Sequence, residues 1–214
     1  SHTSPGAFPS SHAIESKFTP QQWCKRVWRD DAVVLVCVAH PLSSVSEPIS
    51  DATTEGGDGV FEGTWVGIAT MRGPIPASEY ALPAEAGAPT KWQMTAVFAS
   101  AGHRGQGVGK KLIQAAKDYA LAQTMDPRLG LVSAPVKVRF RVLIHPNNLP
   151  VIKLYAGAGF VDAGRATGKE AYRTNGDLAS WVLKLDTLND EEKVYWSTQR
   201  VAVALEWTNE VQVP

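Results

Sequence analysis

The chain has 214 residues, of which 44% are hydrophobic and 20% charged, and its formal net charge is zero. This length favours one domain with an appendage, and the composition excludes a globally disordered chain. No apolar run reaches the roughly 18 to 20 residues that span a bilayer, and no signal-peptide pattern is present. We therefore expect a soluble cytoplasmic protein with no membrane partner.

Although the formal net charge is zero, two regions of the chain carry opposite net charges. Residues 41–90 contain seven acids and one arginine, whereas residues 101–155 contain nine Lys and Arg and two Asp. A basic region favours a polyphosphate ligand, and Lys110, Lys111 and Lys153 are candidates to lie near it. Because the basic residues are not interleaved with aromatic residues, nucleic acid is not an expected partner.

The first elements follow a stretch rich in Ser, Pro and Gly, residues 1–18, which we expect to be a flexible arm. Thr19 followed by Pro20 predicts the start of a short helix. Ala32–Ala39 is a continuous apolar run, typical of a strand covered on both faces. Residues 64–71 form a second strand, which we expect to be its antiparallel neighbour.

The chain carries two cysteines, Cys24 and Cys37. Two are too few for a disulfide framework, and they lack the spacing of metal ligands. We expect both to be reduced core residues, and we expect no metal site.

The middle of the chain predicts a strand, a glycine turn and a helix, in that order. Two loops rich in Gly, Pro, Ser and acids, residues 41–63 and 73–89, precede an apolar strand at 92–98. The turn begins at Arg104 and leads into a helix with apolar residues at helical spacing, which are Val108, Leu112, Ala115, Ala116 and Tyr119. The free N–H groups and positive dipole at such a helix start favour an anion, most naturally a phosphate.

Two common phosphate-binding loops do not fit this turn. A Walker-type loop needs a glycine five residues before the Gly-Lys pair, where this chain has Arg104. A dinucleotide fingerprint needs a small third glycine, where this chain has Lys110.

The remaining elements follow from periodicity and capping residues. Val136–Ile144 alternates apolar with basic residues, which predicts a strand whose start projects past its cover. Asn148 is a candidate N-cap of a helix that ends at Gly159. Residues 160–163 and 179–185 are expected to be two closing strands, with a basic loop at 164–177 between them.

A C-terminal extension, residues 186–214, follows these strands. It contains a capped helix and a strand at 201–207. That strand is expected to lengthen the sheet, to cover its edge, or to pair with a second subunit as a homodimer.

Two motifs resemble the GNAT superfamily of acetyl-CoA-dependent N-acetyltransferases. The run R-G-Q-G-V-G, residues 104–109, is similar to the family's pyrophosphate loop Q/R-x-x-G-x-G/A. The run HPNNLPVIKLYAGAGF is similar to its second signature, with Asn148, Tyr155, Gly159 and Phe160 at the matching positions. The resemblance covers residues 19–185, and it departs from the family at Ala101, where a proline is frequent.

The resemblance implies an α/β (α+β) fold of the GNAT acyl-CoA N-acyltransferase type. In this fold the fourth and fifth strands of a mixed central sheet run parallel and splay apart, and helices flank the sheet. The resemblance also implies that residues 19–185 form the acetyltransferase domain and that acetyl-CoA (coenzyme A) is the cofactor. Its pantetheine arm would lie along Val97 to Ala99, its pyrophosphate would lie on the glycine turn, and Asn148 and Tyr155 would complete the site. The implied cofactor-binding residues are Val97, Phe98, Ala99, Arg104, Gly105, Gln106, Gly107, Val108, Gly109, Lys110, Asn148 and Tyr155.

The implied reaction is direct attack by a primary amine of a small molecule or peptide on the thioester in a ternary complex. Tyr155 matches the family's general acid. His145 is the first candidate for the base, because an imidazole titrates in the right range; Glu79, Tyr80 or a chain of waters are the alternatives. Two other functions stay open, which are an enzyme for longer acyl-CoA donors and a catalytically silent acyl-CoA-binding sensor or interaction module.

Overall fold

The structure is a computed structural model that describes residues 19–21, 24, 29–40, 63–76, 79, 90–125 and 136–211. The N-terminal arm, the loop at 41–62, most of the predicted N-terminal helix and Tyr80 lie outside the described residues. The strands are β1 (Ala32–Ala39), β2 (Thr64–Arg72), β3 (Thr90–Ala99), β4 (Val136–Ile144), β5 (Val161–Ala166) and β6 (Ala202–Val211). The helices are η3 (Ala101–His103), α3 (Val108–Thr124), α4 (Leu149–Ala156), α5 (Gly168–Thr174), α6 (Leu178–Leu185) and α7 (Asp190–Thr198).

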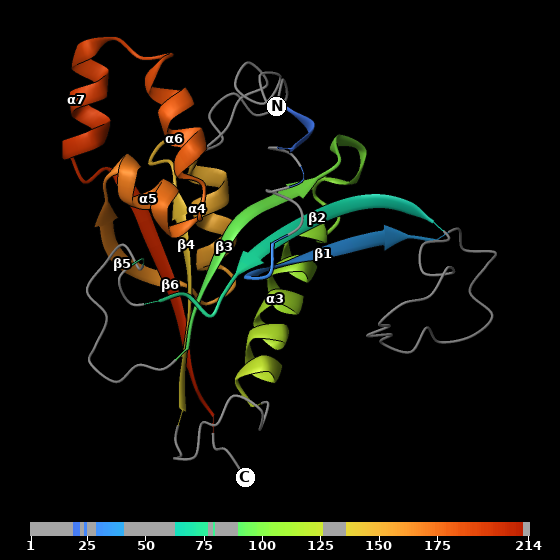
Figure 1. The fold of residues 1–214 in the computed structure, drawn as a ribbon. Helices are drawn as coiled ribbons and strands as arrows, with labels where there is room; N and C mark the ends of the chain where they lie inside the picture. Colours follow the sequence, from blue (N-terminus) through green and yellow to red (C-terminus); the bar gives the residue numbers. More distant parts are fainter. Residues whose placement is uncertain are drawn as a thin grey trace.

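The six strands form one mixed sheet in the order β1-β2-β3-β4-β6-β5 (Figure 1). β1, β2 and β3 are antiparallel neighbours. β3 pairs with β4 in parallel, and β6 pairs antiparallel with both β4 and β5. The predicted mixed sheet with a parallel central pair, flanked by helices, is therefore confirmed, but among the described strands this pair is the third and fourth rather than the fourth and fifth.

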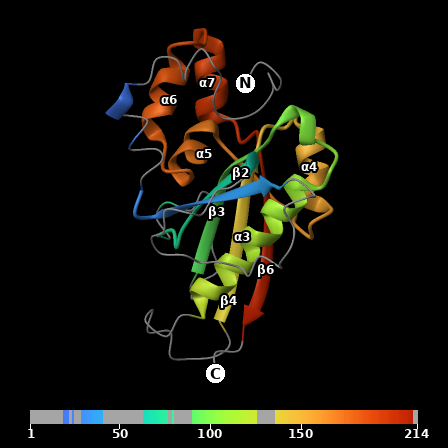
Figure 2. The same cartoon turned by 90° about the vertical axis from the view of Figure 1, so that its right-hand side faces the viewer.

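Helices cover the sheet on both faces. α3 and α4 lie on one face, and α5, α6 and α7 lie on the other face toward one end of the sheet (Figures 1 and 2). The larger core lies under α3 and α4 and contains Met94, Phe140 and Tyr155. A smaller core, made mostly of alanines, contains Leu143 and Ala171.

Helix α3 begins at the predicted glycine turn and packs through one face. Its buried apolar residues are Val108, Leu112, Ile113, Ala116 and Ala120. The prediction of Ala115 in this stripe is wrong, since Ala115 is exposed, and Tyr119 is half-buried with its ring edge-on to Trp92 at 5.9 Å. The buried face of α3 therefore includes Ile113 and Ala120, which were not in the predicted set, and excludes Ala115, which was.

The end of the chain differs most from the prediction. Residues 179–185 were expected to form a strand, but they lie in α6, where Ser180 and Trp181 are buried and Val182 is exposed. The strand predicted at 201–207 exists as β6, but it lies between β4 and β5 rather than at an edge or on a partner. β6 therefore takes the place in the sheet that residues 179–185 were predicted to take.

Strand β1 is only half-buried along its whole length, which corrects the expectation of cover on both faces. It lies at the edge of the sheet, with Val33, Leu35 and Cys37 packed against the larger core. The expectation of two core cysteines is also wrong, because Cys24 is exposed and Cys37 is half-buried.

Strand β4 carries its basic residues in a covered position. Arg141 is buried, and the side chain of Arg139 is only 12% exposed. Both pair with Glu206 of β6, Arg139 at 2.9 Å and Arg141 at 2.7 Å. The polar face of β4 is therefore explained by a carboxylate on the neighbouring strand, not by a start that projects past its cover.

A second charged cluster joins the α5–α6 junction to the sheet. Both guanidinium groups, Arg29 and Arg72, bond to Asp31. Arg72 donates to the carbonyl of Thr174 at 2.9 Å, and Arg29 donates to the carbonyl of Gly176 at 2.9 Å. Cations at the end of a helix satisfy its last carbonyls and oppose the negative end of its dipole, so this cluster holds α5 in place.

This cluster should make stability depend on pH in the acid range. Hydrogen bonds from Arg29, and then from Arg72, lower the pKa of Asp31 from 3.8 to about 2. A depressed folded-state pKa contributes stability above pH 3.8 that is lost as pH falls through about 2. Because the Asp31 side chain is 41% exposed, solvent screening reduces the contribution to about 1 kcal/mol.

We therefore expect Asp31→Asn to lower the free energy of unfolding by about 1 kcal/mol at pH 7. The gap between the variant and the unmodified chain should close as pH falls from about 4 to 2, measured by urea unfolding at each pH. An equal gap at every pH would show that the charge of Asp31 does not contribute.

Candidate active site

The parallel strands β3 and β4 separate partway along their length. Their pairing runs from Thr90 opposite Val138 to Met94 opposite Val142, although β3 continues to Ala99 and β4 to Ile144. The pairing of β3 with β2 shifts at the same level, where Thr95 is an extra residue in β3. Beyond this bulge β3 follows β2 and leaves β4, which opens a wedge between the two strands.

The wedge leads into a cleft of about 930 Å³. Its walls come from the ends of β3 and β4, the glycine turn and the first residues of α3 and α4. Of the predicted site residues, those lining the cleft are Val97, Phe98, Ala99, Arg104, Gly105, Gly107, Val108, Gly109, Lys110, His145, Asn148 and Tyr155. This volume falls within the range of small-molecule and cofactor sites.

Several of the predicted residues do not line the cleft. Gln106 donates from its side chain to the carbonyl of Gly102 at 3.1 Å and so supports the turn from behind. Lys111 and Lys153 are exposed and do not belong to the wall. Glu79, an alternative base, has its carboxylate bonded to Arg72 in the cluster beside α5.

The glycine turn presents unpaired backbone donors to the cleft. Among the backbone hydrogen bonds of the described residues, the N–H groups of residues 105–110 donate to no carbonyl. Gly105 and Gly107 have φ angles of 74° and 83°, which L side chains rarely adopt. Free N–H groups at the start of a long helix are donors of the kind that phosphate groups bind.

The second helix of the site, α4, is held close to this turn. A Cβ on Gly109 would lie 3.1 Å from Cδ2 of Leu154, so a larger residue would require the Leu154 side chain to shift, and glycine favours the close approach of α3 and α4. Asn148 occupies the N-cap position but makes no side-chain cap hydrogen bond. The predicted N-cap position is therefore confirmed without the cap hydrogen bond, and Asn148 also lines the cleft.

Tyr155 lies at the apex of the wedge. Its hydroxyl donates to Sδ of Met94 at 2.7 Å, the residue at which β3 and β4 stop pairing. Complete burial raises the pKa of Tyr155 well above its ordinary value. The hydroxyl therefore stays protonated, and it can act as a donor but not as a base.

A buried lysine on α3, Lys117, contacts the ring that packs against Tyr155. Nζ of Lys117 donates to the carbonyl of Ala158 and lies 5.4 Å from the centre of the Phe160 ring. That ring in turn meets the Tyr155 ring edge-on at 5.1 Å. Burial lowers the pKa of Lys117, and its contacts join α3 to the turn that follows α4.

His145 lies at the other side of the cleft, at the end of β4. Nδ1 accepts the backbone N–H of Asn147 at 3.2 Å, which assigns the proton of a neutral ring to Nε2. Burial and then the positive charge of Lys184 lower the pKa of His145. The ring also lies 5.3 Å from that of Trp196, so α7 packs against the end of β4 here.

Several residues that line the cleft were missing from the sequence prediction, and Met94 and His103 are among them. Met94 has the pattern of a core residue, and no local signal shows that it accepts a hydrogen bond from Tyr155. His103 lines the cleft next to Arg104, and its Nδ1 lies 2.8 Å from Oγ of Ser100. Its place directly before the loop arginine was the signal that could have identified it.

The wedge, the anion-binding turn and the mixed sheet together define an acyltransferase fold of the acyl-CoA type. Residues 57–160 match the family model described as the acetyltransferase (GNAT) family. The chain therefore carries a GNAT-family acetyltransferase domain, and this confirms the resemblance predicted from the two motifs.

Solved structures show similar folds at low identity. A GCN5-related N-acetyltransferase from Kribbella flavida is 14% identical, with a TM-score of 0.48, and the alignment covers 98% of this chain and 84% of that chain. Arabidopsis thaliana NAA60 in complex with acetyl-CoA is 16% identical, with a TM-score of 0.44 and coverage of 91% and 85%. A comparison with curated proteins gives no match. Within the described residues, no helix is both long and apolar enough to span a membrane.

Proposed function

We propose that this chain is an N-acetyltransferase that moves the acetyl group of acetyl-CoA to a primary amine of a small molecule or peptide. The observation that carries the proposal is one cleft with an unpaired N–H turn at one end and a protonated, buried tyrosine at the wedge. The first suits a pyrophosphate, and the second suits a leaving group that departs as an anion.

The cleft fits acetyl-CoA because the residues that line it carry suitable hydrogen-bonding groups and charges. The separated end of β3 turns its free edge toward β4, which gives an extended pantetheine arm backbone groups to pair with. Asn148 lines the same cleft as that edge and the turn. Arg104 and Lys110 add positive charge beside the diphosphate position.

In the proposed reaction the neutral amine attacks the thioester carbonyl, and the C–S bond breaks as the amide forms. The departing thiolate takes the proton of the Tyr155 hydroxyl, which requires Tyr155 to exchange Met94 for the sulfur of the cofactor. A thioether is a weak acceptor, so this exchange costs little. The amine proton leaves to a base, for which we propose His145, because it lines the same cleft as Tyr155.

Thermal unfolding with acetyl-CoA tests the proposal. At a hundredfold excess over the dissociation constant, binding should add about 2.7 kcal/mol and raise Tm by about 5 to 10 °C. Release of free thiol in the presence of a primary amine then tests turnover. No change in Tm at millimolar acetyl-CoA would overturn the proposal.

A matched pair of glycine variants makes this test specific to the turn. Gly107 and Gly159 both have a φ of 83°, so alanine should strain the backbone about equally at the two positions. Only Gly107 lines the cleft. Gly107→Ala should therefore lose much of the acetyl-CoA shift, whereas Gly159→Ala should keep it.

A further inference from the structure

The described residues that line the cleft on the acceptor side are mostly apolar and include no carboxylate. Phe98 lines the cleft, yet its side chain is 50% exposed, which is unusual for an aromatic residue inside a sheet strand. None of the described residues that line the cleft is Asp or Glu. An acceptor with several positive charges would therefore meet no partner for them in this part of the wall.

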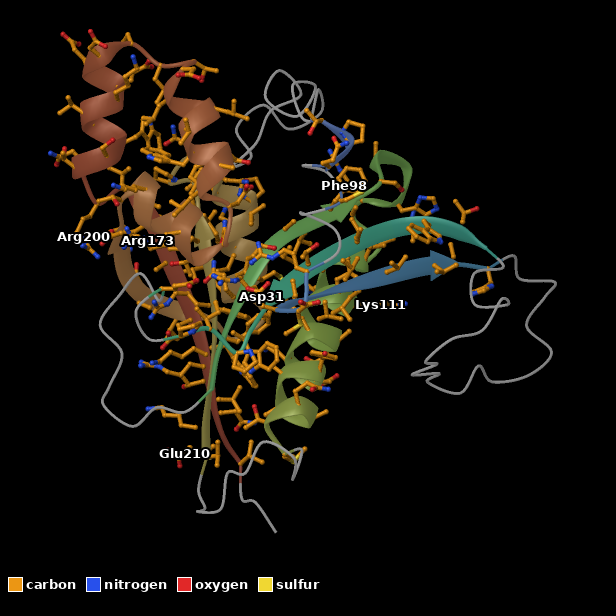
Figure 3. All side chains as sticks on the ribbon, in the orientation of Figure 1. Asp31, Phe98, Lys111, Arg173, Arg200 and Glu210 are labelled. Atoms are coloured by element: carbon orange, nitrogen blue, oxygen red, sulfur yellow. The ribbon has the colours of Figure 1, made fainter. Side chains whose placement is uncertain are left out.

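Phe98 belongs to an apolar row that crosses three strands. Val36 pairs with Ile68, and Ile68 pairs with Phe98, so the three side chains lie on the same face of the sheet. The neighbouring residues Val33, Leu35, Val97 and Ala99 pack toward the core under α3. The row thus lies on the face opposite α3, and its last residue, Phe98, lines the cleft. Figure 3 shows Phe98 near the end of β3.

The row continues the proposed active site on the side away from the glycine turn. The turn and Tyr155 belong to α3 and α4, on the other face of the sheet. A thioester held in the wedge would present its acetyl group between these two faces. An amine that reaches it from the face opposite α3 passes over Phe98.

From this placement we infer that the acceptor is a primary amine on an apolar, uncharged body, which lies over Val36, Ile68 and Phe98. The inference rests on the proposed function and narrows its acceptor class. Burial of an apolar body on this row would supply binding energy next to the reacting amine. Polyamines and lysine-rich segments would be poor acceptors, because their remaining charges would lose water without gaining a partner.

The test compares two primary amines, 2-phenylethylamine and spermidine. The rest of the first molecule is apolar and uncharged, whereas the rest of the second carries further positive charges. We expect kcat/KM for 2-phenylethylamine to exceed that for spermidine by about tenfold or more, the size of discrimination that apolar contacts give. Phe98→Ala should reduce this ratio by about tenfold, because the apolar contact is lost for one substrate alone. Leu149→Ala is the control, since Leu149 is an exposed apolar residue of α4 outside the cleft wall.

The outcomes separate this inference from the proposed function. A preference for spermidine, or a ratio that Phe98→Ala leaves unchanged, overturns the inference while acetyl transfer itself stands. A Tm of the unmodified chain that acetyl-CoA does not raise overturns both. A Phe98→Ala protein that keeps the acetyl-CoA shift and loses the preference supports the inference, because folding and cofactor binding are then intact.

Discussion

Replacing Tyr155 with phenylalanine should lower kcat by on the order of 100-fold or more, with little change in the affinity for acetyl-CoA. A positioned proton donor contributes about 10²- to 10⁴-fold to such a step. The ring would keep its edge contact with Phe160, and only the hydroxyl that now donates to Met94 would be lost. The measurements are thiol release under saturating amine and the Tm shift with acetyl-CoA.

Tyr119→Phe is the matched control for this variant. Tyr119 lies on α3 outside the cleft wall and packs edge-on against Trp92. Its hydroxyl has no role in the proposed reaction, so kcat should stay within about twofold. A Tyr155→Phe protein with an unchanged rate would remove Tyr155 from the mechanism while leaving acetyl-CoA binding in place.

Lys117 gives a structural reason why this hydroxyl holds one position. Its ammonium group lies 4.8 Å from the Trp207 ring of β6 and contacts the Phe160 ring as well. Since Phe160 also donates its N–H to the carbonyl of Tyr155 at 3.1 Å, α3, α4 and β6 all fix the same tyrosine. The donor is therefore held by contacts between elements far apart in the sequence.

The glycine turn and its helix could be predicted because their signals are local. Gly107, Gly109 and the apolar spacing after them lie within one short stretch, and each has a direct structural meaning. The wedge beside them could not be predicted from spacing alone. It depends on the bulge at Thr95 and on the level at which β3 stops pairing with β4, and both are set by neighbouring strands.

The prediction of a strand at residues 179–185 was wrong because the local sequence signal was ambiguous. Residues 179–185 form a short apolar run, and such a run fits a strand or a helix equally well. The helix prevails because Trp181 and Ser180 are buried together against α5, with Trp181 against the Tyr172 ring at 5.4 Å. The strand-like run at 201–207 had the clearer signal, but its sequence could not show that β6 lies between β4 and β5.

The largest loss of stability is expected from Glu206→Gln. Glu206 is 4% exposed, and its two carboxylate oxygens accept from Arg139 at 2.9 Å and from Arg141 at 2.7 Å. Breaking a buried ion pair from one side typically costs about 3 to 5 kcal/mol, because the remaining charge has been taken out of water. Here two guanidinium groups in the middle of the sheet would lose this carboxylate, so we expect a loss at the upper part of that range.

Urea unfolding of three proteins tests this expectation. Asp162→Asn is the control, since Asp162 forms an exposed pair with Arg165, and it should cost less than about 1 kcal/mol. A triple variant, Glu206→Leu with Arg139→Met and Arg141→Met, should recover most of the loss, because apolar residues of similar size can replace a buried ion cluster. A midpoint for Glu206→Gln within the range of the control would show that β4 and β6 do not depend on this charge. In that case the pairing with Glu206 of β6 would not explain why β4 carries buried arginines.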